Sequence, residues 1–399
     1  MAELNPSRTG SCLLAYLYGT QNAGDFAICY GALDFLTSRY NQVYAVSRYN
    51  EKDEEFAQAK SLLETRYGHA VRLMPGPFTL DRHSKFSTLS SYAKGLISLF
   101  WHSVLPWKRK IVENVDCVYV NGGNLLRCAS LTDSIRLKPF LYFAQEAKKL
   151  DVPYVLLPQS TSTISASGKR YIEDALAGAS LTFFRESVSF RKANNLNLPN
   201  VKLAIDMAYF IEDGENQKAI NVASSTKDRV CFTFRRHQIG DIGLLDDDKV
   251  IEIEKKIRDL VVALRDAGEK VAFVVQTKKD IDFTEEVYAA IGDETIEVVE
   301  EYDPLKLREL YRQAKCLIGM RLHSIILASS VGTPVVGYFD KSWGNKNEGT
   351  LADLKMPCCF VGDDYDLYSL YASSMVNLAE MNSTINCRKR LLRTELDGL

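Results

Sequence analysis

The chain contains two successive series of short apolar runs that alternate with amphipathic segments of helical length. This alternation is typical of βαβ units and predicts an α/β fold with parallel sheets covered by helices. The clearest helical segment, residues 246–268, has an acidic start, apolar residues at 3.6-residue spacing and a closing glycine. The predicted strands are residues 12–19, 42–48, 70–76, 116–123, 153–160, 181–186 and 201–206 in the first series, and 229–236, 270–276, 295–301, 314–320 and 334–339 in the second.

A polar stretch without strong periodicity, residues 211–228, separates the two series and is the expected interdomain linker. We therefore predict an N-terminal Rossmann-like domain in residues 1–215, a C-terminal Rossmann-like domain in residues 216–365, and C-terminal helices in residues 366–399. Ligands of open α/β sheets bind beyond the carboxyl ends of the strands. Functional residues are therefore expected at those ends, in a cleft between the two domains.

Composition narrows the classes of protein that the chain can represent. The 399 residues are 46% hydrophobic and 25% charged, which is typical of a soluble globular protein. A formal net charge of −2 argues against a nucleic-acid-binding protein. The first residues lack the pattern of a secretory signal, and no apolar run reaches the roughly 18 residues of a membrane span. Nine cysteines without a C-x-x-C pair indicate reduced thiols in a cytoplasmic setting, and five histidines without ligand spacing predict no metal site.

The end of the first predicted strand carries polar residues and a glycine. Asn22, Gly24 and Asp25 stand where this strand gives way to a helix. The first N–H groups of a helix are unpaired and can bind an anion or a sugar oxygen. A simpler interpretation is that Asp25 only caps the helix. A G-x-G-x-x-G sequence is absent here, which disfavours a nicotinamide or flavin cofactor.

Other predicted strands of the first series also end in polar side chains. Asn121 and Asn124 flank a pair of glycines after one strand, and Gln159 and Ser160 end the next. These groups suit a neutral polar ligand, although paired glycines are also ordinary turn residues.

Charged side chains end the last two strands of this series. Arg185 and Glu186 follow one of them, and a surface ion pair is the simpler interpretation there. Asp206 follows the next strand and can cap a local turn.

The segment GMRLHSIILASSVGTPVVGYFDK, residues 319–341, carries the strongest signal in the second series. A helix that begins after Met320 has Arg321 and His323 in its first turn. The helix dipole already favours negative charge there, so two cations are costly unless an anion joins them. An anion site is therefore predicted, against the alternative of a buried histidine beside an incidental arginine. Arg235 and Arg236 end the first strand of the same series and are further candidates.

Several of these segments together resemble one known family. N-x-G-D at residues 22–25, V-N-G-G-N near residue 121, R-E-S-x-S from Arg185, the aspartate at 206, R-L-H-S from Arg321 and G-T-P-V-V-G-Y-F-D-K resemble the polysaccharide pyruvyltransferase family. The resemblance spans about residues 12 to 350. The chain departs from the family where Asn124 replaces a frequent third glycine, and where STSTIS replaces a glycine-rich segment. Both departures concern the acceptor sugar more than the chemistry.

The resemblance implies a fold similar to that of GT-B glycosyltransferases. It also implies transfer of the pyruvate moiety from phosphoenolpyruvate to two hydroxyls of a sugar, in a glycan or a lipid-linked saccharide, with formation of a cyclic ketal and release of phosphate. The donor is a co-substrate, and neither a cofactor nor a metal is required. Arginine forks and a helix N-terminus match its carboxylate and phosphate. The expected donor-binding residues are Arg321, Leu322, His323, Ser324, Arg235 and Arg185.

The same resemblance suggests roles in the chemistry. His323 is the expected general acid, because an imidazole titrates near neutrality. Asp25 is the candidate base that deprotonates the attacking hydroxyl, and Arg321 stabilises the leaving phosphate. The expected acceptor-binding residues are Asn22, Asp25, Asn121, Asn124, Gln159 and Ser160.

Two other functions remain open from the sequence. A sugar-nucleotide-dependent glycosyltransferase on the same fold would use paired acids near the donor, and Asp340 and Glu348 loosely fit that pattern. A non-enzymatic glycan-binding module would leave the cations at 321 and 323 without a purpose.

Residues 93–110 hold two of the three tryptophans and end in a basic cluster. They suit either peripheral contact with the inner face of a membrane or a core helix and loop.

Overall fold

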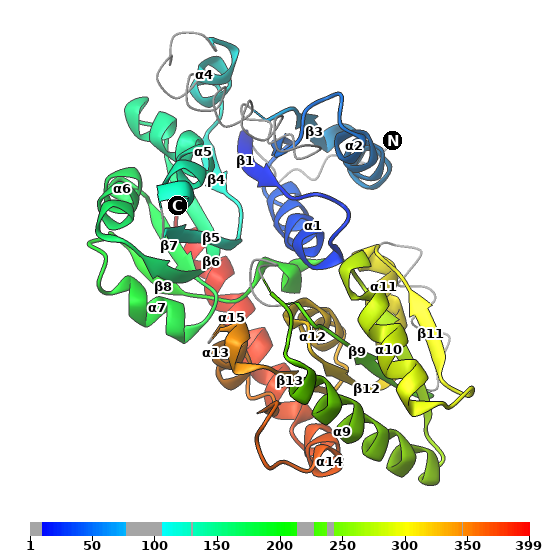
Figure 1. Cartoon of the computed structure of the whole chain (residues 1–399). Helices are drawn as coiled ribbons and strands as arrows, with labels where there is room; N and C mark the ends of the chain where they lie inside the picture. The colour runs from blue at the N-terminus through cyan, green and yellow to red at the C-terminus, as the bar shows by residue number, and fades with distance from the viewer. Residues whose placement is uncertain (1–9, 77–105, 129–130, 214–226, 238–242, 345) are drawn as a thin grey trace. The chain divides into compact units, whose positions relative to one another are not determined.

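This computed structural model describes residues 10–76, 106–128, 131–213, 227–237, 243–344 and 346–399. The chain forms two compact units that are not continuous in sequence. Unit 1 comprises residues 1–20, 28–211 and 395–399, and unit 2 comprises residues 21–27 and 212–394. The predicted boundary at 215/216 and most of the predicted linker lie outside the described residues. Each unit contains its own sheet (Figure 1).

Unit 1 is built on a sheet whose strand pairings are all parallel. The strand order is β3-β2-β1-β4-β6-β7-β8, and β5 also pairs with β6. The strands are β1 (Ser11–Leu17), β2 (Gln42–Ser47), β3 (Val71–Met74), β4 (Cys117–Val120), β5 (Gly123–Cys128), β6 (Tyr154–Ile164), β7 (Leu181–Phe184) and β8 (Val201–Leu203). Central strands such as β4 are buried along their whole length, because a parallel sheet is covered on both faces.

The connections of this sheet are mainly helical. They are α1 (Ala23–Thr37), α2 (Glu54–Tyr67), η1 (Gly68–Ala70), α4 (Pro106–Glu113), α5 (Leu131–Lys149), α6 (Ala166–Leu176), α7 (Ser187–Ala193) and η3 (Met207–Phe210). The first turn of α1 belongs to unit 2. Of the stretch 93–110, residues 93–105 lie outside the described residues, and the remainder begins α4.

Unit 2 contains a parallel sheet with the order β11-β10-β9-β12-β13-β14. The strands are β9 (Arg229–Thr233), β10 (Lys270–Val275), β11 (Glu297–Glu300), β12 (Ala314–Gly319), β13 (Val335–Phe339) and β14 (Cys358–Phe360). Helices and short 3-10 turns connect and follow them: α9 (Asp247–Asp266), η5 (Lys278–Asp280), α10 (Ile281–Ile291), α11 (Pro304–Arg312), α12 (Leu322–Ser330), η6 (Lys341–Trp343), α13 (Lys346–Asp353), α14 (Leu367–Val376) and α15 (Leu378–Asp397).

These sheets confirm the predicted α/β fold. Every predicted strand overlaps an observed one, and α9 begins as expected, with the Asp246 side chain accepting from the Lys249 N–H at 3.0 Å. The strand predicted over 116–123 corresponds to β4, which ends at Val120, and β5, from Gly123 to Cys128, was not predicted. The extension of β6 to Ile164 was not predicted, because the second half of this strand has a polar sequence. Strand prediction depends on apolar alternation.

Both sheets have the strand order of doubly wound folds. The direction of strand addition reverses between β1 and β4 in unit 1 and between β9 and β12 in unit 2. Ligands of such folds bind outside the carboxyl ends of the strands at this switch point. The residues after β9 and β12 therefore define the best place for a site in unit 2.

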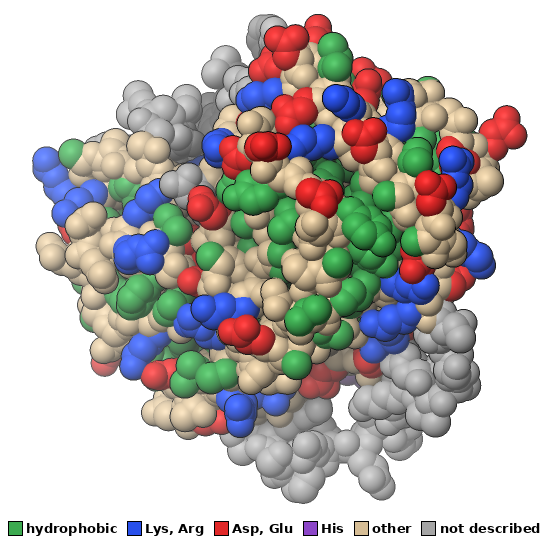
Figure 2. Space-filling model, turned by 90° about the horizontal axis from the view of Figure 1, so that it is seen from below, with side chains coloured by type: hydrophobic (Ala, Val, Ile, Leu, Met, Phe, Trp, Pro, Cys, Tyr) green, Lys and Arg blue, Asp and Glu red, His purple; other side chains and the backbone are tan. Residues whose placement is uncertain are grey.

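Two further observations concern the surface and the thiols. On the face shown in Figure 2, the acidic and basic side chains of the described residues are interspersed around an apolar central area. Within the described ranges, no helix has the length and apolar character needed to cross a membrane. All nine cysteines are free thiols, and seven of them are buried.

Candidate active site

The turn from β12 into α12 holds Arg321 and His323. Arg321 has an extended backbone and occupies the N-cap position of α12, and its own side chain makes no capping hydrogen bond. Ser324 ties the turn to the neighbouring strand, because its hydroxyl lies 2.8 Å from the Thr233 hydroxyl and donates to the Arg321 carbonyl at 2.7 Å. Ser324 and Leu322 are buried, whereas Arg321 and His323 are partly exposed. The first N–H groups of α12, the Arg321 guanidinium and the His323 imidazole thus share one helix end.

Arg321 is held in a fixed orientation by Asp280, the last residue of η5. The Arg321 Nε donates to Asp280 Oδ2 at 2.7 Å, and its Nη2 donates to Asp280 Oδ1. Within the described part of the chain, Nη1 has no hydrogen-bond partner. Burial raises the pKa of the Asp280 carboxyl, while the charge of Arg321 acts in the opposite direction. A forked pair of this kind fixes the guanidinium plane and leaves its other edge for a ligand.

Arg235 supplies a second cation near the same carboxylate. It stands two residues after the end of β9, its Nε donates to the His237 carbonyl at 2.7 Å, and its guanidinium lies 5.1 Å from the ring centre of Trp343. Trp343 is fully buried. Arg235 and His237 both lie close enough to Asp280 to lower its pKa against the effect of burial. The ends of β9, β10 and β12 therefore bring three cationic or titratable side chains around one buried acid.

His323 lies against the first turn of α1. A Cβ atom at Gly24 would stand only 2.6 Å from the His323 Cβ, so the backbone of this turn approaches the imidazole side chain closely. The Asn22 side chain accepts from the Gly24 N–H at 3.0 Å and donates to Asp25 Oδ2 at 3.1 Å. Asn22 also forms an isolated antiparallel bridge with Thr277. The turn that carries Asn22 and Asp25 thus approaches His323 through Gly24, within unit 2.

The candidate residues of unit 1 are largely used inside that unit. Asn121 and Gln159 are fully buried. Asn121 donates to the Tyr16 carbonyl at 3.0 Å, and Gln159 donates to the Asn121 carbonyl and accepts from the Leu125 N–H. Asn124 differs, because its buried Oδ1 has no hydrogen-bond partner among the described residues. Direct contact of these side chains with an acceptor remains a prediction.

Arg185 forms a buried ion pair with Asp206 rather than a surface pair with its neighbour. The two side chains are 2% and 1% exposed, and the Arg185 Nε also donates to the Ser160 hydroxyl at 2.7 Å. Asp206 accepts from the Ala208 N–H at 2.8 Å, so it caps η3 as the sequence allowed. Glu186 accepts from the backbone N–H of Ser189 and caps α7. The predicted donor set is therefore divided between the units.

Three residues of this site were missed by sequence reasoning: Asp280, His237 and Trp343. Asp280 stands five residues beyond β10 and is separated from Arg321 by 41 positions, so only the folded chain reveals the pair. His237 follows Arg235 and Arg236 directly, and a titratable residue beside two arginines at a strand end was an available signal.

The acids that would support sugar-nucleotide chemistry have other roles. Asp340 is 2% exposed and forms an ion pair with Lys249 at 2.8 Å. It also accepts from the Ser342 N–H, which caps η6. Glu348 is exposed on α13. The two do not form a pair of available acids.

Comparisons with known proteins identify the fold and the family. Solved structures of UDP-N-acetylglucosamine 2-epimerases resemble the chain in fold. One has a TM-score of 0.57 at 12% identity, covering 95% of this chain and 91% of that one. The Neisseria meningitidis enzyme bound to UDP-GlcNAc has a TM-score of 0.54 at 11% identity, covering 98% of this chain and 100% of that one. The Methanocaldococcus jannaschii enzyme has a TM-score of 0.52 at 11% identity, covering 97% of this chain and 99% of that one. These likenesses establish a GT-B fold.

A search of curated protein sequences found no match. A family model described as polysaccharide pyruvyl transferase matches residues 22–338, a range that begins at Asn22 and includes Arg235, Asp280, Arg321 and His323. The chain therefore belongs to the polysaccharide pyruvyl transferase family and is a transferase with the GT-B fold.

Proposed function

We propose that the protein transfers the pyruvate moiety of phosphoenolpyruvate to two hydroxyls of a saccharide, forming a cyclic ketal and releasing phosphate. The observation that carries the proposal is the Arg321 guanidinium, which Asp280 orients at the open end of α12 beside His323. The donor is a small anion with a carboxylate and a phosphate. An oriented guanidinium and a helix N-terminus are the groups that bind such anions best.

Each step of the reaction has a candidate among the residues of unit 2. His323 gives a proton to the methylene carbon of the donor, which makes the adjacent carbon electrophilic. Asp25 accepts the proton of the first attacking hydroxyl. The second hydroxyl then displaces phosphate from the same carbon, and its proton leaves with the phosphate. Two C–O bonds to the sugar thus replace the C=C π bond and the bond to phosphate. Arg321 and Arg235 stabilise the charge of the leaving group.

Arg185 is left out of the donor set in this proposal. Its guanidinium is 2% exposed and already contacts Asp206 and Ser160. Sugar-nucleotide transfer is less well supported than pyruvyl transfer, because Asp340 is paired with Lys249 and Glu348 stands apart on α13.

Phosphate release tests the proposed function directly. The protein is incubated with phosphoenolpyruvate and a panel of galactose-, mannose- and glucosamine-containing acceptors, and phosphate and acceptor mass are measured together. We expect phosphate to appear only with an accepted sugar, in equal amount to a pyruvate adduct. UDP release from UDP-sugars without any need for phosphoenolpyruvate would support the glycosyltransferase instead.

Arg321→Lys is expected to raise the KM for phosphoenolpyruvate by about tenfold with a smaller change in kcat. Lysine keeps the positive charge but cannot contact Asp280 and the donor with a planar fork. Loss of one hydrogen bond to a charged group is worth about 1.5–3 kcal/mol, which corresponds to about tenfold or more in binding. Steady-state kinetics with varied donor measure the effect. Arg236→Lys is the control, because Arg236 pairs with Glu286 and Asp247. Equal KM values for both variants would remove Arg321 from the donor site.

A further inference from the structure

A guanidinium without a carboxylate partner lies at the carboxyl edge of the unit 1 sheet. Arg48 directly follows β2, and its backbone N–H donates to the Leu17 carbonyl at the end of β1. Its guanidinium lies 5.5 Å from the ring centre of Tyr18 and 4.9 Å from that of Phe140. The Arg48 side chain is partly exposed and forms no ion pair or hydrogen bond with any residue that the structure describes. The aromatic rings hold the cation, but they supply no acceptor for its in-plane N–H groups.

Glu55 is an acid at the same edge, and a neighbouring turn uses its carboxylate. It is buried in the first turn of α2 and accepts from the Thr20 N–H at 2.7 Å and from the Thr20 hydroxyl at 3.0 Å. Elsewhere in unit 1, the partly buried Arg66 pairs with Asp34 at 2.6 Å. Arg48 has no corresponding acid, so an anionic ligand is a suitable partner for it.

Tyr18 connects this cation to the turn between β4 and β5. Its hydroxyl donates to the Gly122 carbonyl at 2.7 Å. A Cβ atom at Gly123 would stand 2.4 Å from the same hydroxyl, so only glycine allows the backbone to pass this close. Asn124 follows Gly123, and its buried Oδ1 has no hydrogen-bond partner within the described ranges. A buried polar atom of this kind is costly unless a ligand or a water molecule completes its hydrogen bond.

The sheet places these side chains where a ligand of unit 1 is expected. The pairing of β5 with β6 starts opposite Gln159, whereas β4 ends opposite Leu156, so β5 continues beyond the carboxyl end of β4. The direction of strand addition reverses between β1 and β4, and ligands of doubly wound sheets bind outside the strand ends at that point. We refer to Arg48, Tyr18 and Asn124 together as the Arg48 site.

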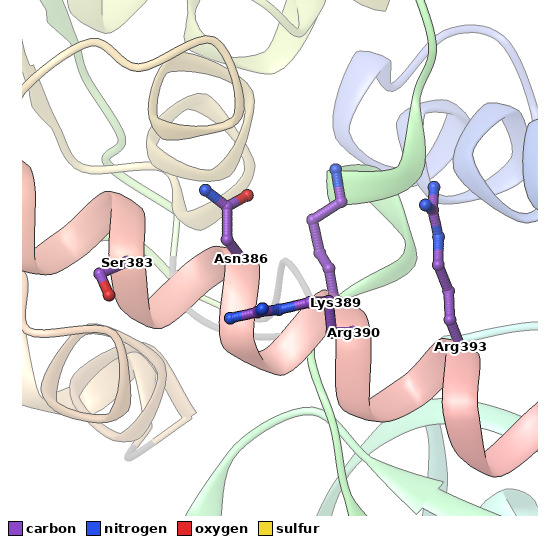
Figure 3. A pocket seen from close by; sticks show the side chains of 5 residues that line it. All are labelled: Ser383, Asn386, Lys389, Arg390 and Arg393. Atoms are coloured by element: carbon purple, nitrogen blue, oxygen red, sulfur yellow. The ribbon is translucent and has the colours of Figure 1, made fainter.

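A pocket with more basic residues lies along α15 in unit 2, but its cations have acidic neighbours. It has a volume of about 510 Å³ and is lined by Ser383, Asn386, Lys389, Arg390 and Arg393 (Figure 3). Burial and the charge of Arg393 lower the pKa of Lys389, while the charges of Glu212 and Asp213 act in the opposite direction. The Arg48 site therefore has the stronger need for an external anion.

We infer that the Arg48 site binds an acidic saccharide, a sugar that carries a carboxylate or a phosphate group. The Arg48 guanidinium donates two parallel N–H···O bonds to the anionic group. The Asn124 amide oxygen, near the hydroxyl end of Tyr18, accepts the proton of a sugar hydroxyl. A neutral sugar would leave the Arg48 donors unused, and a simple anion without a hydroxyl would leave the Asn124 acceptor unused. That this saccharide is the acceptor substrate rests on the proposed function, whereas its binding does not.

A ligand-detected NMR titration in the absence of phosphoenolpyruvate tests the inference. Glucuronate, galacturonate and glucose 1-phosphate are compared with neutral glucose and galactose. We expect at least one acidic sugar to bind about tenfold or more tightly than its neutral counterpart, with a smaller difference as salt is added. The acidic sugar that binds best identifies the anionic group as a carboxylate or a phosphate. Equal binding of acidic and neutral sugars would overturn the inference.

Two substitutions of Arg48 locate the preference. Arg48→Met removes the charge and the N–H donors but keeps a flexible apolar side chain against the aromatic rings, and we expect it to abolish the preference for acidic sugars. Arg48→Lys keeps the charge without the planar fork and is expected to lose most of the preference. Thermal unfolding verifies that each variant is folded, and the lysine variant decides the test if the methionine variant is not.

Arg72→Met is the matched control, because Arg72 is exposed on the neighbouring strand β3. We expect it to keep the full preference for acidic sugars. A loss of the same size in this variant would reduce the effect to general charge attraction and overturn the inference. A preference that survives in both Arg48 variants would come from another place, such as the site around Arg321, and would overturn it as well.

Binding and turnover together separate this inference from the proposed function. Because the titration needs no donor, a preference that depends on Arg48 supports the Arg48 site even where no pyruvyl transfer is detected. Pyruvyl transfer to neutral and acidic sugars alike, without any preference in binding, would support the proposed function and overturn the inference.

Discussion

Replacing His323 by alanine is expected to lower kcat for phosphate release by about 10²–10⁴-fold, with little change in the KM for phosphoenolpyruvate. General acid catalysis contributes a factor of this size, and it acts in the transition state rather than on the bound donor. Steady-state kinetics with saturating acceptor measure both constants. His69→Ala is the control, because this imidazole is exposed in η1 of unit 1.

The separation of kcat from KM is what makes this prediction specific. A histidine that only binds the donor would raise KM when removed, with kcat nearly unchanged. A histidine that only packs against the turn at Gly24 would lower the stability of the protein without a selective effect on turnover. Either pattern would contradict the assignment of His323 as the proton donor.

Arg185→Ala is expected to lower the free energy of unfolding by about 3–5 kcal/mol. Removal of one partner of a buried ion pair leaves the other charge uncompensated in a medium of low polarity. Asp206 would be that charge, since its side chain is only 1% exposed. Urea denaturation measures the loss. Arg185→Met combined with Asp206→Asn is expected to be more stable than Arg185→Ala, because neither member of the former pair is then left as an uncompensated charge.

The matched control is Lys148→Ala. Lys148 pairs with Asp174 at 3.0 Å, but the two side chains are 37% and 70% exposed. Exposed ion pairs contribute about 0–1 kcal/mol, so this variant should be nearly as stable as the unmodified protein. A loss for Arg185→Ala no larger than that of the control would show that the ion pair is not structural. It would also return Arg185 to the candidate donor-binding residues.

The fold was predictable from the sequence wherever a local pattern encodes it. Residues 246–268 carry a cap, a periodic apolar face and a closing glycine, and α9 forms there. The three-residue strand β14 has too little sequence to show a pattern. β5 begins with Gly123 and Asn124 and contains only a short apolar run, so no strand pattern marks it in the sequence. Short and polar strands gain their stability from neighbours in the sheet, which a single sequence does not reveal.

The same limit applies to the candidate site. Arg321 and His323 were found because a strand, a helix start and two cations coincide within a few residues. Asp280 was missed because its partner is distant in sequence, and Arg185 was paired with the wrong acid for the same reason. Adjacent residues near a strand end point in opposite directions, so Arg185 reaches Asp206, while Glu186 turns to α7.

The pairing of Asp280 with Arg321 also affects how easily a product leaves the enzyme. Asp280 offsets much of the positive charge of Arg321, so the net attraction on an anion is weaker than that of an isolated guanidinium. In the proposed reaction, the released phosphate would therefore be held by a well-oriented guanidinium whose charge is partly offset. We expect such a product to dissociate without the long residence that limits many enzymes at product release.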